Sequence, residues 1–153
     1  MTARLLLALL LFLGAPALAR AQADLASQRE CASCGMDRKA YGYSRMLIGF
    51  EEGPDVGVCS LHCAVAVIDA RPARRVRSIA VADRATHELI DAARAAWVMG
   101  GGKRGVMTQR PKWAFRTQAG AAAFIAAHGG VHAPWEKALA AARAEIAAKR
   151  PEP

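Results

Sequence analysis

The chain has 153 residues, and its 21 lysines and arginines against 13 acidic residues give a formal charge of +8. Such a basic balance is often typical of nucleic-acid binding, but the first residues predict export to a compartment that holds little nucleic acid, which excludes that class. No Ser-His-Asp set, paired carboxylates or nucleotide fingerprint is evident, so no enzyme activity is predicted.

Residues 1–23 predict a secretory signal peptide. Arg4 supplies a positive charge, an apolar stretch runs from Leu5 to Leu18, and Ala21-Gln22-Ala23 is a typical cleavage site before Asp24. The apolar run of about 15 residues is shorter than the ~20 that a spanning helix needs, and no cysteine at the cleavage site offers a lipid anchor. Cleavage removes two arginines and lowers the formal charge from +8 to +6. We therefore expect a periplasmic protein that is not a lipoprotein.

The mature chain begins with a polar stretch, 24–30, expected to be a mobile leader, and a Gly-containing turn, Cys31–Met36. Residues 44–50 alternate between apolar and polar side chains, which predicts a half-buried strand. Further expected elements are strands over 56–59 and 76–81, with a helix from an N-cap at Ser60 to Ala70 between them.

A similar order follows in the second half. Strands are expected over 95–99 and 112–116, separated by the glycine-rich loop 100–105, and Thr117 then caps an alanine-rich helix that ends before Gly129-Gly130. The segment 87–96 fits a helix or a short strand equally well. The tail, 136–150, has high helix propensity and predicts a helix on the surface.

The repeated order predicts an α+β fold built from two small ββα(β)-type lobes with short antiparallel sheets and a C-terminal helix. The expected division places an N-terminal cysteine-containing lobe at 24–82, a C-terminal lobe at 83–135 and a helical tail at 136–153. The mature length is enough for two small lobes that share a core.

The four cysteines form two pairs, Cys31 with Cys34 and Cys59 with Cys63. Two thiols two residues apart can point into one knuckle, and a second pair at a strand end and in the first helical turn can converge on the same point. The spacing leaves three interpretations open: a four-thiolate zinc site, two structural disulfides, or a soft copper(I) site. A thioether ligand favours copper(I) over zinc, so Met36, directly after Cys34-Gly35, indicates copper if it is a ligand.

Three weaker features accompany the cysteines. The glycine-rich loop ends near Met107, which is either presented as a ligand or tucked inside, and His62 between the second cysteine pair could replace a thiol as ligand, although a surface role is expected for it. The arginines of 71–77 predict a solvated loop, with a docking patch for an acidic partner as the alternative.

Several short motifs in order resemble the NosL family: Cys-x-x-Cys-Gly-Met, Ile90-Asp91-Ala92, the glycine-rich loop that ends in Met107, Ala114-Phe115, Ala122-Ala123-Phe124 and His128-Gly129-Gly130. The resemblance spans roughly residues 31–135. It implies an exported copper(I) chaperone that assists nitrous oxide reductase or its maturation machinery, with two ββα-type lobes. By position it also implies Cys34, Met36 and Met107 as copper ligands, with Cys31 next.

A second resemblance keeps zinc as the rival metal. Cys59-Ser-Leu-His-Cys63 is similar to the Cys-Ser-x-x-Cys of treble-clef heavy-metal-binding modules of the YHS and TRASH type. This likeness implies that all four thiols form one site, in a structural or interaction module without a transfer role. A thiol-disulfide enzyme using Cys31 and Cys34 is the least favoured alternative, because no thioredoxin-like βαβ order surrounds the pair.

Overall fold

The computed structural model describes residues 22–149, so most of the predicted signal peptide lies outside the described residues. The elements follow one another as α3 (Ala23–Ser27), β1 (Met46–Phe50), β2 (Val56–Val58), α4 (Leu61–Asp69), β3 (Val76–Ala82), β4 (Leu89–Asp91), β5 (Ala96–Met99), β6 (Lys112–Phe115), α5 (Gln118–His128), β7 (Val131–Ala133) and α6 (Trp135–Ala147). The predicted α+β class is confirmed.

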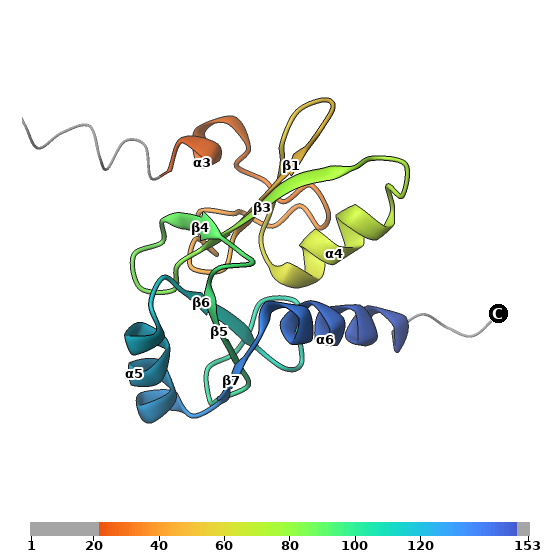
Figure 1. The fold of residues 1–153 in the computed structure, drawn as a ribbon. Coiled ribbons are helices and arrows are strands. Elements are labelled where there is room, and N and C mark those ends of the chain that lie inside the picture. Colours follow the sequence, from red (N-terminus) through yellow and green to blue (C-terminus); the bar gives the residue numbers. More distant parts are fainter. Residues whose placement is uncertain (1–21, 150–153) are drawn as a thin grey trace, which may run out of the picture.

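Two antiparallel sheets organise the chain (Figure 1). The first has the strand order β2-β1-β3-β4 and the second the order β6-β5-β7. In β1 the alternation places Met46, Ile48 and Phe50 in the core, each almost fully buried. The ambiguous segment 87–96 contains the short edge strand β4, paired with β3.

Helices α4 and α5 begin where the sequence indicates. Ser60 caps α4 and its hydroxyl accepts a hydrogen bond from the backbone N–H of Cys63, while Thr117 caps α5 in the same way through Gly120. Gly129, at a φ of 74°, ends α5. Because Ala138 and Ala142 are small and fully buried, α6 packs closely beside α4 (Figure 1).

A single hydrophobic core reaches from the cysteines to the C-terminal helix. It joins Met46 and Ile48 of the first sheet with Trp97 and Met99 of the second and with Ala138 of α6. A smaller cluster around Trp113 and Phe124 lies under α5. The division into lobes at residue 82 stays a prediction.

The prediction that residues 24–30 form a mobile leader is wrong. Residues 23–27 form α3, and the Asp24 side chain, only 5% exposed, bridges the fully buried guanidinium groups of Arg38 and Arg45 at 2.6 and 3.0 Å. Arg38 also donates to the carbonyls of Met46 and Val58. These contacts fix the start of the mature chain to the body of the fold.

Candidate metal centre

The first cysteine pair lies in a closed turn. The backbone N–H of Cys31 donates to the carbonyl of Met36 and that of Gly35 donates to Cys31, both at 2.9 Å. Gly35 adopts a φ of +75°, which a side chain would strain, so glycine is suited to this position. The turn is tied to the first sheet by a hydrogen bond from Ala32 to Gly57.

The second pair comes from the junction of β2 and α4. Cys59 directly follows β2, and Cys63 lies in the first turn of α4, one turn after the Ser60 cap. The Gly35 turn and the start of α4 therefore position the two pairs of cysteines.

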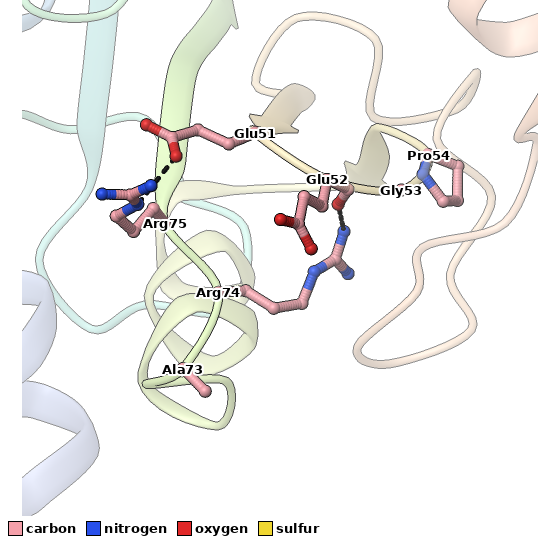
Figure 2. A pocket seen from close by; sticks show the side chains of 7 residues that line it. All are labelled: Glu51, Glu52, Gly53, Pro54, Ala73, Arg74 and Arg75. Carbon is pink, nitrogen blue, oxygen red and sulfur yellow. Dashed lines mark hydrogen bonds and ion pairs between the residues drawn. The ribbon is translucent and has the colours of Figure 1, made fainter.

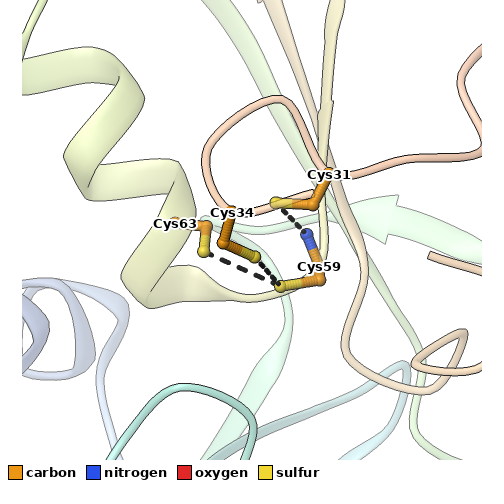
Figure 3. A group of neighbouring side chains, drawn as sticks. All are labelled: Cys31, Cys34, Cys59 and Cys63. Atoms are coloured by element: carbon orange, nitrogen blue, oxygen red, sulfur yellow. Dashed lines mark hydrogen bonds between the residues drawn. The ribbon is translucent and has the colours of Figure 1, made fainter. Parts of the chain in front are cut away.

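The four sulfurs converge on one point (Figure 3), each within 4.8 Å of the others. The Sγ atom of Cys59 lies 3.6 Å from that of Cys34 and 3.7 Å from that of Cys63. A tetrahedral metal bound by four thiolates at about 2.3 Å separates its sulfurs by roughly 3.8 Å. All four cysteines are free thiols, so the two-disulfide interpretation does not describe this structure.

Burial and hydrogen bonding distinguish the thiols from one another. Cys31, Cys59 and Cys63 are buried, whereas Cys34 is half-buried. Hydrogen bonds from Cys59 and Cys63 lower the pKa of Cys31, and the backbone N–H of Cys59 donates to the same sulfur at 3.3 Å. The hydrogen bond with Cys31 raises the pKa of the Cys59 thiol, and the corresponding bond raises the pKa of the Cys63 thiol to about 12. Contacts among the thiols thus change the pKa of each of the three buried cysteines.

The structure places the two candidate methionines differently. Met36 is half-buried and packs against the same core as the cysteines. Met107 is 40% exposed and has a φ of 57°, a conformation that is rare for a side chain of this size. Its neighbours Val106 and Thr108 line a small cavity together with residues 60–62. The structure gathers the four thiols and leaves Met107 exposed on an adjoining loop.

The histidines lie outside the group of four sulfurs. His62 lines the small cavity beside α4, its Nδ1 atom is buried without a hydrogen-bond partner, and burial lowers its pKa. His128 stacks edge-on against Phe124 at 4.8 Å, and His132 lies in the edge strand β7. Among the described residues, the group that could hold a metal consists of the cysteines alone.

The loop that carries Met107 is held at two places, the end of α5 and the side of α6. The backbone N–H of Gly102 donates to the carbonyl of His128 at 2.7 Å. The Thr108 hydroxyl donates to the Glu145 carboxylate of α6 at 2.6 Å, and the Lys112 ammonium group donates to the same carboxylate at 2.8 Å. Sequence reasoning missed this network, because Glu145 is 37 residues from Thr108 and no local pattern connects them.

The arginine-rich segment 71–77 meets acidic residues of the β1–β2 turn (Figure 2). Arg75 pairs with Glu51 at 2.7 Å, and Arg74 donates to the carbonyl of Glu52 at 2.6 Å while it lies over the ring of Phe50. Two of the four arginines of this segment, Arg75 and Arg77, are thus paired with carboxylates of the same chain.

Comparison with known proteins places this arrangement in a family. The NosL family model matches residues 22–140. The chain belongs to the NosL family. The crystal structure of the copper chaperone NosL from Shewanella denitrificans superposes with a TM-score of 0.58, at 21% sequence identity, over 72% of this chain and 90% of that one. That likeness shows a shared fold, and no curated protein matches the chain. No helix in residues 22–149 is long and apolar enough to cross a membrane.

Proposed function

We propose that this NosL-family chain is a periplasmic copper(I) metallochaperone that takes up the ion at its sulfur cluster and passes it on by ligand exchange. The observation that carries the proposal is the convergence of four free thiols within 4.8 Å of one another. Thiolate and thioether sulfur are the ligands that copper(I) prefers. Family membership and the copper chaperone with the same fold support the choice of metal.

Exposure suggests how the ion is released. An incoming ligand must reach the metal, and the buried sulfurs of Cys31, Cys59 and Cys63 offer little access. Cys34 is half-buried and Met107 is exposed, so these two form the open side of the proposed site, with Met36 as a further thioether ligand. A thioether binds less strongly than a thiolate, which suits a site that must let its cargo go.

A structural zinc site is the second candidate. Sulfur separations of 3.6 and 3.7 Å are near the roughly 3.8 Å of a tetrahedral four-thiolate centre, and zinc adopts that geometry. Copper(I) binds the same thiolates and commonly accepts fewer of them. The copper(I) site and the zinc site differ in the expected role of the methionines, because zinc gains little from a thioether ligand.

The partner and the compartment are further parts of the proposal. We propose nitrous oxide reductase, or the machinery that matures it, as the acceptor of the copper, with a cleaved signal peptide over residues 1–23 placing the mature chain in the periplasm. The chain would then act as a carrier and not as an enzyme. A copper-loaded site would also protect its thiols from oxidation there.

The test uses the mature protein, purified without oxygen. Thiol titration first establishes that the cysteines are reduced, and copper(I) is then titrated against a chromophoric chelator. We expect about one copper(I) per chain, held through thiolates, and a weaker affinity in Met36→Ala and Met107→Ala. Reduced protein that binds no copper(I) would refute the function, whereas unchanged affinity in both methionine variants would refute only the ligand assignment.

A further inference from the structure

The loop between β5 and β6, residues 100–111, carries three cations and no acidic residue. Lys103, Arg104 and Arg110 are all exposed. Their side chains form no ion pair with any residue in the part of the chain that the structure describes. The loop therefore presents uncompensated positive charge to solvent.

The other basic surface of the protein differs in this respect. Arg75 and Arg77 pair with Glu51 and Asp55 at 2.7 and 3.1 Å. These exposed pairs offset two of the segment's four positive charges within the chain. Of the two basic segments, the β5–β6 loop is the one in which no cation has an acidic partner among the described residues.

The cations flank Met107 in the sequence of a loop that hydrogen bonds tie to the rest of the fold. Each lies within four residues of Met107, a span of at most about 14 Å of extended chain. The loop is closed at its base by the hydrogen bond from Gly100 to Pro111 at 2.8 Å, and it is tied to α6 through Thr108 and Glu145. A charge held this close to an exposed thioether acts on whatever approaches that sulfur.

We propose that the β5–β6 loop is a docking surface for an acidic protein face that surrounds a soft metal acceptor. The inference rests on the proposed copper transfer, because it makes Met107 the point of contact. Positive charge accelerates the encounter with an acidic face and orients that face. The transfer of the metal itself takes place between sulfur ligands. The attraction reaches about one Debye length, roughly 8–10 Å at physiological salt.

An anionic lipid surface is the other partner that cations attract. The loop fits it poorly, because membrane-binding segments also insert large apolar side chains, and Met107 is the one exposed large hydrophobic residue within residues 100–111. An exposed thioether among cations can hand a metal ion to an acidic protein that accepts it, whereas a lipid headgroup accepts no metal from it.

The test uses two synthetic acceptor peptides with the same methionine- and cysteine-containing copper site, one flanked by aspartate and glutamate and the other by serine. Peptide binding to the metal-free mature protein is measured by fluorescence anisotropy, and copper(I) transfer from the loaded protein by stopped-flow. We expect the acidic peptide to bind more tightly and to be loaded about 10-fold faster at low salt. Both advantages should disappear near 1 M salt, where the Debye length is about 3 Å.

Matched variants locate the effect. The triple variant Lys103→Gln, Arg104→Gln, Arg110→Gln should lose the preference for the acidic peptide. The control Arg75→Gln, Arg77→Gln, Arg94→Gln removes the same net charge outside the loop and should keep it. Equal preference in the loop variant and the native protein, or its loss in the control, would overturn the proposal.

Two further outcomes are decisive. Vesicles that contain phosphatidylglycerol should not bind through the loop, and loop-dependent vesicle binding without any peptide preference would overturn the proposal in favour of a membrane. Peptide binding to metal-free protein is measured without copper, so a protein that holds no copper(I) would refute the chaperone function and still leave the docking result readable.

Discussion

Asp24 offers the sharpest test of the packing. Its carboxylate is the acidic partner that the structure gives to Arg38 and Arg45, whose side chains are both fully buried. Removing one partner of a buried ion pair leaves an uncompensated charge and costs about 3–5 kcal/mol. A domain of this size has about 5–15 kcal/mol of stability in total, so Asp24→Asn should remove a large part of it.

The assay is urea unfolding of the mature protein, followed by tryptophan fluorescence. Asp55→Asn is the matched control, because Asp55 forms an exposed pair with Arg77 that should contribute about 0–1 kcal/mol. Asp24 is also the first residue after the predicted cleavage site, so a chain that begins at Leu25 should be destabilised like Asp24→Asn. A loss below about 1 kcal/mol in Asp24→Asn, equal to that of the control, would show that the arginines do not depend on this carboxylate.

Three other predictions concern the β5–β6 loop and Asp83, which joins the end of β3 to the residue after β6. Glu145→Gln weakens the hydrogen bonds to Thr108 and Lys112, which with a charged acceptor contribute about 1.5–3 kcal/mol each. The copper(I) affinity should therefore fall although no ligand is lost. An affinity equal to that of the native protein would show that the loop needs no such support. Met107→Gly relieves the backbone strain of the φ of 57°. The variant should unfold at an equal or higher urea concentration and bind copper(I) more weakly. A lower stability would mean that the Met107 side chain packs in the fold. Burial opposes ionisation of Asp83, but hydrogen bonds from the backbone N–H groups of Arg116 and Thr86 and from the Thr86 hydroxyl outweigh it and keep its pKa below 3.8. Because the folded pKa is the lower one, this stabilisation is present above about pH 4 and is lost as the pH falls through the folded value, so the destabilisation in Asp83→Asn should shrink in acid; a difference from native that is constant down to pH 2 would contradict it.

Local chemistry made the first half of the fold predictable. The alternation of Met46, Ile48 and Phe50 and the cap at Ser60 are decided within a few residues, so strand and helix follow from the sequence. The turn at Gly35 follows from its neighbours in the same way. These elements also bring the two cysteine pairs together, which is why a sulfur site could be expected from spacing alone.

Long-range contacts account for the errors. Residues 24–30 are polar and predict a leader, but their order depends on Arg38 and Arg45, which enclose Asp24 only after the sheet has formed. The strand β7 was missed because its three residues carry little pattern and pair with β5 across the chain. The arginines of 71–77 predicted a solvated loop, with a docking patch as the alternative, and only the folded turn at Glu51 reveals that Arg74 and Arg75 contact its residues.

The central claim is that the four-sulfur cluster handles copper(I) and not zinc. Reduced mature protein is equilibrated without oxygen with equimolar copper(I) and zinc(II), each buffered by a competing chelator, and the metal that remains after desalting is measured. We expect about one copper per chain and no zinc, since soft sulfur ligands favour copper(I). Protein that retains zinc and excludes copper would contradict it and establish the cluster as a structural zinc site.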